Sequence, residues 1–343
     1  MDEYRLVVFG DDWDVYQTAY RSLIENPSVY FISTFRPKGM LGQLQRLQFN
    51  PRLNSICRIP FKEKWNPYYL RNLPRQRGSD EEKLCFLILE NWLRVEGGIR
   101  LLPYLRSHYP EARIVCFTQD LIATIEDHYT RRPIDVDYIK RYVDLWISYD
   151  LSDVRKYDLV YHPTVFSPTN IVRDESRPRY DLYFLGRDKG RLPLLVAICK
   201  AAKEKGISCL FLLVEVPKEK QIVCDGIQYI DYPVTYQENL QNCANSHCVL
   251  ELLQQDAVSP SFRVWECISL NRKLLTNNRC INQQDVYDDR YVSMFQTVDD
   301  IDWHFVSEDV SFPEDCNPYL DDIRPENLVS FIDKQLNIKI RLS

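Results

Sequence analysis

Residues 180–195 read YDLYFLGRDKGRLPLL. The apolar run Asp181–Leu185 predicts a strand, and Gly186 with the basic residues that follow predicts a turn. Pro193 fits the first turn of a helix that begins near Leu192, because its missing N–H would have no partner there. The stretch therefore predicts a strand, a basic turn and a helix in succession.

The turn carries three cations, Arg187, Lys189 and Arg191. Together with the free backbone N–H groups and the positive end of the helix, these cations would form a cradle for an anion. A phosphate or diphosphate is the natural ligand of such a cradle. An ordinary strand-to-helix turn with solvated cations explains the same residues, so both interpretations stay open.

The composition is that of a soluble globular protein with two domains. The chain has 343 residues, of which 45% are hydrophobic and 27% charged. With 43 basic and 49 acidic residues its net charge is −6, which argues against general nucleic-acid binding. We find no signal-peptide pattern and no long apolar run, and the eleven cysteines are scattered. These features predict a cytoplasmic protein.

Apolar runs alternate with helix-like stretches along most of the chain, a pattern typical of parallel, doubly wound sheets. The polar stretch 166–179, FSPTNIVRDESRPR, is typical of an interdomain linker. We predict a first α/β domain at 1–168, a linker at 169–179 and a second α/β domain at 180–343. A terminal helix is expected at about 325–336. The two Rossmann-like domains would face a cleft between the carboxyl ends of their strands.

Several elements of the first domain can be placed from the same pattern. Strands are predicted at Tyr4–Phe9, Leu84–Glu90 and Arg113–Phe117, and a helix at Leu121–Tyr129.

The stretch 35–77 interrupts this alternation and is strongly basic. We predict a loop with short helices, rich in aromatic residues and with Glu63 as its one acid. Such a segment could contact the inner face of the cell membrane or a lipid-phosphate acceptor. Alternatively, its aromatic residues pack inward and its cations are only solvated. The basic residues are Arg36, Lys38, Arg46, Arg52, Arg58, Lys62, Lys64, Arg71, Arg75 and Arg77.

A second candidate site lies at 259–267, which reads SPSFRVWEC. Ser261 is a good helix N-cap, and Arg263 and Glu266 follow one turn apart. The carboxylate of Glu266 could accept two hydrogen bonds from the hydroxyl groups of a ribose. Alternatively, Arg263 and Glu266 pair with each other on the helix surface.

Three runs of the second half resemble GT-B glycosyltransferases, in particular the bacterial enzymes that build lipopolysaccharide and capsule. They are YDLYFLGRDKGRL at 180–192, ENLQNCANSHCVLELLQ at 238–254 and SPSFRVWECISLNRKLLTNN at 259–278. WISYDLSDVRKYDLVYHP at 146–163 is a weaker match. The resemblance implies that the second domain binds a nucleotide-sugar donor and the first domain a glycan or lipid-linked acceptor.

The resemblance also implies roles for individual residues. Arg187 and Lys189 would meet the diphosphate and Glu266 the ribose. Ser261 and Arg263 would lie beside the diphosphate or the sugar. No cofactor is expected besides the donor substrate. The complete set of predicted donor-binding residues is Gly186, Arg187, Lys189, Arg191, Ser261, Arg263 and Glu266, with Tyr232 as a stacking face for the nucleobase.

The catalytic group is predicted in the first domain. The better-known retaining pattern has two glutamates eight positions apart, but Val258 stands eight positions before Glu266. We therefore predict an inverting enzyme, which needs a general base. Asp11 and Asp12 follow the first strand and are the first candidates, and Asp120 is the next. Capping of the following helix explains the aspartates at the first strand equally well.

We predict no metal site. Of the Asp-x-Asp pairs in the sequence, the one at 12–14 comes too early and the one at 135–137 precedes a helix as a capping pair would.

The predicted activity is transfer of a sugar from a nucleotide-sugar to a lipopolysaccharide, capsule or other lipid-linked glycan. A nucleotide-sugar epimerase and a non-catalytic sugar-nucleotide or glycan-binding protein are the alternatives. A receiver-type signalling module would leave the second half of the chain unexplained.

Overall fold

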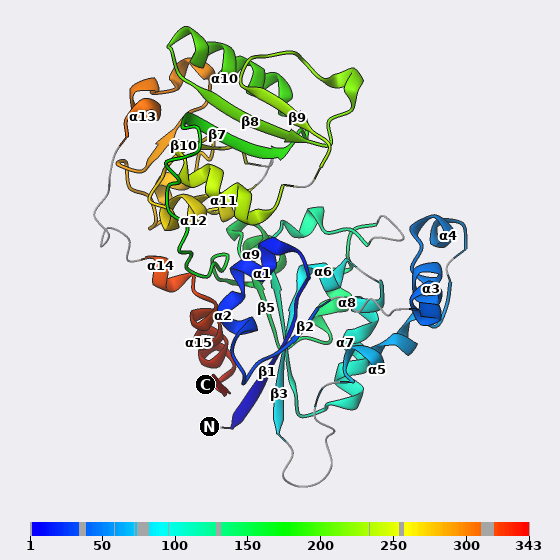
Figure 1. The fold of residues 1–343 in the computed structure, drawn as a ribbon. Coiled ribbons are helices and arrows are strands. Elements are labelled where there is room, and N and C mark those ends of the chain that lie inside the picture. The colour runs from blue at the N-terminus through cyan, green and yellow to red at the C-terminus, as the bar shows by residue number, and fades with distance from the viewer. Residues whose placement is uncertain are drawn as a thin grey trace. The chain divides into compact units, whose positions relative to one another are not determined.

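The chain forms two compact units in the computed structural model (Figure 1). Unit 1 comprises Met1–Ser167 and Pro325–Ser343, and unit 2 comprises Pro168–Arg324. The residues that the structure describes are 2–33, 39–57, 59–71, 73, 82–94, 96–127, 132–232, 234–253, 257–309 and 319–342.

Unit 1 is built on a parallel sheet in the order β13-β1-β3-β4-β5-β6, with β2 also paired to β1. Its strands are β1 (Glu3–Phe9), β2 (Tyr30–Ile32), β3 (Lys83–Leu89), β4 (Arg113–Thr118), β5 (Leu145–Ser148), β6 (Val160–Tyr161) and β13 (Lys339–Arg341). Its helices are α1 (Asp14–Ala19), α2 (Arg21–Ile24), α3 (Gly39–Gln48), α4 (Pro51–Ile56), α5 (Asn66–Tyr69), α6 (Glu90–Leu93), α7 (Glu96–His108), α8 (Val136–Lys140), α9 (Leu151–Tyr157) and α15 (Pro325–Leu336).

One face of this sheet packs on α7. Phe86 and Ile88 of β3 lie in one core with Leu101 and Leu105 of α7, and all four side chains are fully buried. Because parallel strands are covered on both faces, they appear in the sequence as continuous apolar runs, as β3 does.

The other face packs on α15. The ring of Phe117 in β4 lies 6.0 Å from the ring of His162, which lies 5.0 Å from the ring of Phe331 in α15. The His162 Nδ1 lies 2.7 Å from the Pro163 carbonyl oxygen. The histidine is therefore a packing residue of this layer.

Unit 2 is built on a second parallel sheet in the order β12-β11-β10-β7-β8-β9. Its strands are β7 (Tyr180–Arg187), β8 (Cys209–Val214), β9 (Ile227–Ile230), β10 (Ser246–Glu251), β11 (Lys273–Thr276) and β12 (Val292–Met294). Its helices are α10 (Leu192–Glu204), α11 (Tyr236–Ala244), α12 (Phe262–Ser269), α13 (Trp303–Ser307) and α14 (Tyr319–Asp322).

Helices cover both faces of this sheet as well (Figure 1). Leu182 and Phe184 of β7 share a core with Leu195 of α10. The intervening Tyr183 points to the opposite face, where its hydroxyl donates to the Asn239 Oδ1 of α11 at 3.1 Å. The predicted fold class, two doubly wound Rossmann-like domains, is confirmed.

The end of the chain does not belong with the second domain, where it was predicted. The terminal helix has the predicted bounds, but α15 and β13 lie in unit 1. β13 pairs in parallel with the start of β1, Glu3 opposite Lys339 and Arg5 opposite Arg341. This return satisfies the backbone of β1 at an edge that would otherwise be open, which the local sequence of β13 does not reveal.

Of two local predictions for unit 1, the short helices within 35–77 and the helix at 121–129, the structure agrees with the first and not with the second. The stretch 39–69 contains short helices, as predicted, whereas 34–38 and much of 72–81 lie outside the described residues. The predicted helix at 121–129 is wrong: a 3-10 turn spans Ile122–Thr124, and Glu126 then bridges to Pro133. The Asp153 carboxylate accepts from the Ile122 N–H at 2.8 Å and fixes this turn.

No helix in the described residues is long and apolar enough to cross a membrane.

Replacing Ile332 with alanine should destabilise unit 1 selectively. The side chain is fully buried in α15, so the cavity should cost about 2–5 kcal/mol. Hydrogen exchange should accelerate in β1 and α15 and stay unchanged in β8 and α10. Val172→Ala, at an exposed position, is the control and should change stability by less than about 0.5 kcal/mol. Faster exchange in β8 instead would contradict the assignment of α15 to unit 1.

Candidate functional site

The strand order reverses once in each sheet. In unit 1, β1 has β2 on one side and β3 on the other, so the reversal lies between β1 and β3. In unit 2 it lies between β7 and β10. Loops that leave two such neighbouring strands diverge, and ligands of doubly wound sheets bind at the carboxyl ends there. Residues of a ligand site are therefore expected at these two points.

The basic turn of unit 2 stands at its reversal point. β7 ends at Arg187, and Lys189 and Gly190 then take left-handed backbone conformations, with φ of 44° and 80°. The Asp188 carboxylate accepts from the Leu192 N–H at 2.8 Å and so caps α10. The predicted strand, turn and helix are confirmed, and one orphan N–H of the helix already has an internal acceptor.

Arg191 is a structural residue of this turn. Its guanidinium donates to the carbonyl oxygens of Leu252 (2.8 Å), Arg187 (2.5 Å) and Asp188 (3.2 Å). The bond to Leu252 joins the ends of β10 and β7 across the reversal point. A Cβ at Gly186 would lie 3.1 Å from the Phe184 ring and 3.2 Å from the Arg191 Nη2, so a side chain there would have to displace both slightly. Burial and the nearby Arg263 lower the pKa of Arg191.

The other two cations of the turn are accessible. Arg187 is exposed and pairs with the equally exposed Glu215 at 3.0 Å, and Lys189 is also exposed. Tyr232, the predicted stacking residue, is exposed just after β9, two strands away from β7. Both Arg187 and Lys189 are thus exposed to solvent at this edge of the sheet.

α12 begins at the same edge. The Ser261 hydroxyl accepts from the Arg263 N–H at 3.1 Å, as predicted for an N-cap, and donates to the Glu251 carboxylate. Glu251 is the last residue of β10 and also accepts from the Thr276 hydroxyl at 2.5 Å. Burial raises the pKa of Glu251. Glu251 was not predicted as a site residue, because in the sequence it resembles any other residue of a strand.

Arg263 and Glu266 pair with each other at 2.7 Å, but inside the protein instead of on its surface. Arg263 also donates to the Leu185 carbonyl oxygen at 3.2 Å and the Asn239 Oδ1 at 3.3 Å. The second oxygen of Glu266 lies 3.4 Å from the Asn239 amide. The Glu266 side chain is 4% exposed, so little of its carboxylate is accessible to a ribose.

The reversal point of unit 1 carries a polar cluster. The Asp11 carboxylate accepts from the Trp13 N–H at 3.1 Å and from the Asn91 amide at 2.8 Å. Trp92 donates to the Gly10 carbonyl oxygen at 2.6 Å, which also ties β3 to β1. Asp11 therefore forms a turn before α1 and does not itself cap the helix, whose N-cap is Trp13. Asp12 is exposed beside it.

Glu90 is the member of this cluster that sequence analysis missed. It follows β3 directly, is 1% exposed and accepts hydrogen bonds from the Tyr16 hydroxyl and from the Gln119 N–H (3.3 Å). Burial and the charge of Asp120 raise the pKa of Glu90 to about 8. A carboxyl group that titrates near neutral pH at such a position is a candidate acid or base.

The remaining acidic candidates are paired or used as caps. Asp120 forms an ion pair with Arg94 at 2.5 Å. Asp135 caps α8 by accepting from the Tyr138 N–H at 2.9 Å, as predicted. Within the described residues, no group of three His, Cys, Asp or Glu side chains could hold a metal ion.

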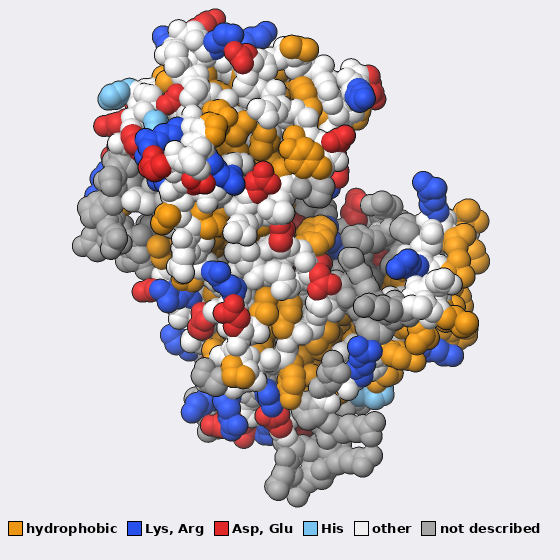
Figure 2. All heavy atoms as spheres, viewed as in Figure 1, with side chains coloured by type: hydrophobic (Ala, Val, Ile, Leu, Met, Phe, Trp, Pro, Cys, Tyr) orange, Lys and Arg blue, Asp and Glu red, His pale blue; other side chains and the backbone are white. Residues whose placement is uncertain are grey.

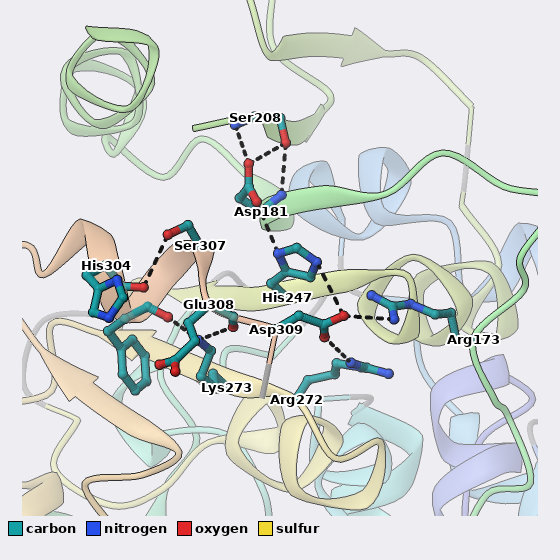
Figure 3. Close-up of polar contacts among 11 residues, drawn as sticks. Arg173, Asp181, Ser208, His247, Arg272, Lys273, His304, Ser307, Glu308 and Asp309 are labelled. Carbon is teal, nitrogen blue, oxygen red and sulfur yellow. Dashed lines mark hydrogen bonds and ion pairs between the residues drawn. The ribbon is translucent and has the colours of Figure 1, made fainter. Parts of the chain in front are cut away.

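A second polar network of unit 2 lies at the opposite, amino-terminal edge of its sheet (Figure 3). His247 bonds to Asp181 at 3.0 Å, and Asp181 also accepts from Ser208. Asp309 pairs with Arg173 at 3.1 Å and lies 3.8 Å from Arg272. The network attaches the chain at Asp309 to the starts of β7, β10 and β11 and does not touch the candidate site.

Comparisons with known proteins agree with this architecture. No protein-family model matches the sequence, and no curated protein matches it. Solved structures do match: the chain has the two-domain, Rossmann-like fold of GT-B glycosyltransferases.

Three of these structures are trehalose-phosphate synthases or are related to them. The UDP-forming α,α-trehalose-phosphate synthase of Burkholderia xenovorans, in complex with glucose-6-phosphate, has a TM-score of 0.55 at 11% identity over 97% of this chain and 99% of that one. The trehalose-6-phosphate synthase OtsA has a TM-score of 0.54 at 11% identity, over 97% of this chain and 98% of that one. A trehalose-6-phosphate structure from E. coli bound with UDP-2-fluoro glucose has a TM-score of 0.52 at 10% identity, over 96% of this chain and 95% of that one.

Glu90 should make the stability of unit 1 fall as pH rises. Its pKa is about 8 in the folded protein and near 4.5 when unfolded, so between these values only the folded state holds the proton. The contribution of Glu90 to the free energy of unfolding should be largest below pH 4.5. It should decline between pH 4.5 and pH 8, by at most about 1.4 kcal/mol per pH unit. Glu90→Gln keeps a neutral side chain of the same size. Its melting temperature relative to the wild type should rise from pH 5 to pH 8; a constant difference would contradict the raised pKa.

Proposed function

We propose that the protein is a glycosyltransferase that moves a sugar from a nucleotide-sugar to a glycan acceptor of the lipopolysaccharide, capsule or other lipid-linked type. The observation that carries the proposal is the exposed pair of cations, Arg187 and Lys189, at the strand-order reversal of a GT-B-like unit. The fold supports the reaction class, and the sequence resemblance to polysaccharide-building enzymes supports the acceptor class.

In this proposal unit 2 binds the donor. Arg187 and Lys189 meet the diphosphate, and its charge grows as the bond to the sugar breaks. Cations and backbone N–H groups that are already in place stabilise this charge without reorganisation. Tyr232 offers its exposed ring to the nucleobase. The buried Arg263–Glu266 pair positions the start of α12 against β7.

Unit 1 provides the general base. The acceptor hydroxyl oxygen forms a bond to the anomeric carbon, the bond from that carbon to the diphosphate oxygen breaks, and the hydroxyl proton passes to a carboxylate. Asp11, Asp12 and Glu90 at the β1–β3 reversal are the candidates. Asp120 is less suited, because its carboxylate is already engaged in an ion pair with Arg94.

Removing a cation of the turn should slow the reaction and weaken donor binding. Arg187→Ala and Lys189→Ala should each cost about 2–4 kcal/mol of leaving-group stabilisation. The donor is first found by thermal shift with UDP-, GDP-, CMP- and dTDP-sugars, since a ligand at 100 times its Kd adds about 2.7 kcal/mol of stability. Turnover is then measured with that donor.

Glu215→Gln is the matched control for these variants. It removes the partner of Arg187 and leaves the cation in place, so turnover should stay the same or increase. Equal turnover in the wild type and both alanine variants would remove the turn from the mechanism. Conversion of the donor without any acceptor would instead identify an epimerase, and binding without release of the nucleotide a binding protein.

Replacing the base should lower kcat and leave donor affinity unchanged. Asp11→Asn keeps the shape of the side chain and should lower kcat by about 10²–10⁴ if Asp11 accepts the proton. Asp12→Asn and Glu90→Gln are compared with it, and the variant that removes the acidic limb of the pH profile identifies the base. Asp137→Asn, at an exposed position of α8, should have no effect. Unchanged profiles in all three would place the base elsewhere.

A further inference from the structure

An apolar surface stands on the segment between β2 and β3 of unit 1. It is formed by exposed side chains of α3, α4, α5 and the turn before α5. In Figure 1, α3 and α4 lie to one side of the sheet of unit 1. Figure 2 shows apolar side chains gathered over α3 and α4, with Lys and Arg side chains beside them. The exposed members of this apolar surface are Met40, Leu41, Leu44, Leu47, Leu53, Ile56, Phe61 and Tyr68.

The apolar side of α3 faces outward. Met40, Leu44 and Leu47 recur at helical spacing and are all exposed, Met40 to 85%, whereas the buried residue of this helix is Gly42. An amphipathic helix normally buries its apolar stripe against its own domain. The reversed orientation of α3 indicates a partner outside the chain, because contiguous exposed apolar areas mark interaction sites.

A groove of about 410 Å³ runs through this surface. Its lining is almost wholly apolar and includes aromatic rings as well as aliphatic side chains. Gln48 and Lys64 are its polar members, and the other lining residues are Leu41, Leu44, Leu47, Ile59, Pro60, Phe61, Trp65 and Tyr68.

Hydrogen bonds beneath the groove hold its walls together. Gln48 accepts from the Trp65 indole at 2.7 Å and donates to the Pro60 carbonyl oxygen at 2.5 Å. Asn54 donates to the Gln48 carbonyl oxygen at 2.9 Å and accepts from the buried Lys62 ammonium at 2.8 Å. The surface is therefore a built feature of the fold, with a defined shape.

The charge around the groove is positive. The sequence from 39 to 71 has six basic residues and one acid in a chain of net charge −6. That acid, Glu63, is paired with Arg100 of α7 at 2.9 Å. Arg46, Arg52 and Lys64 are exposed beside the apolar side chains. The occupant of this surface must be both apolar and anionic.

We infer that this surface docks on an anionic phospholipid bilayer, with its apolar side chains among the acyl chains and its cations at the headgroups. Amphipathic helices bind bilayers in this way, and each basic residue near an anionic surface adds to the attraction. The open groove continues onto the exposed faces of α3 and α4, which suits a bilayer better than one enclosed lipid. Docking on a bilayer does not depend on the proposed function. The further statement that the acceptor resides in the membrane rests on the proposed function.

Vesicle sedimentation of the full chain tests this inference. The wild type should pellet with vesicles of equimolar phosphatidylcholine and phosphatidylglycerol, and at least tenfold less with phosphatidylcholine alone or in high salt. The double variant Leu44→Ser, Ile56→Ser should weaken binding to the mixed vesicles at least tenfold. Arg52→Glu with Lys64→Glu should abolish the preference for the anionic lipid. The control, Val172→Ser with Val223→Ser, alters exposed apolar positions of unit 2 and should bind as the wild type does.

Two results would overturn the docking. One is wild-type protein that stays in the supernatant with mixed vesicles, or a Leu44, Ile56 double variant that binds them unchanged. The other is a lipid-free dimer in sedimentation velocity that the same variant dissociates, which would assign the surface to a second copy of the chain. Melting curves confirm that the variants fold. Donor thermal shift is read separately: vesicle binding without donor binding would refute the proposed function and leave the docking standing.

Discussion

Both units depend on side chains that tie together the two strands at which the strand order reverses. The loops after these strands diverge, so no neighbouring loop satisfies the backbone groups between them. In unit 2 the guanidinium of Arg191 donates hydrogen bonds to carbonyl oxygens at the ends of β7 and β10. In unit 1 Asn91 and Trp92 bind Asp11 and the Gly10 carbonyl oxygen. The diverging loops at a reversal point leave room for a ligand. Some of the polar side chains at that point are therefore used to satisfy the backbone instead of binding the ligand.

The two reversal points stabilise their buried carboxyl groups in opposite ways. Glu266 has a guanidinium 2.7 Å away, and losing one member of such a buried pair costs about 3–5 kcal/mol because the other charge is left unpaired. Glu90 instead accepts from a hydroxyl and a backbone N–H, and it keeps its proton near neutral pH. A fixed ion pair suits a residue that positions an element. A carboxyl that titrates near pH 8 suits a residue that exchanges a proton.

The sequence predicts most of the fold because the strands of both sheets are buried on two faces. β3 and β8 are continuous apolar runs, and Pro193 and Pro325 mark two helix starts. β13 could not be predicted, since its three residues become a strand only by pairing with β1 at the other end of the chain. The helix expected at 121–129 fails for a related reason, because the backbone N–H of Ile122 donates to the carboxylate of the distant Asp153.

The candidate site was predictable as a location but not residue by residue. Arg187, Lys189 and Arg191 are equivalent in the sequence, and the hydrogen bonds of Arg191 to carbonyl oxygens, among them that of Leu252, distinguish it from the two exposed cations. Glu90 resembles the polar end of a strand, and its raised pKa arises from burial and from the charge of Asp120. These distinctions come from groups far apart in the chain, which no local pattern records.

The return of the chain to unit 1 changes how the two units are connected. A single linker at 169–179 would allow unit 2 to swivel freely. Instead the chain crosses twice, at 167–168 and 324–325, so unit 2 is inserted into unit 1. Two covalent connections between the same two units restrict their relative motion more than a single linker would. In the proposed transferase, donor and acceptor bind to different units, and the double connection limits how far these units can separate.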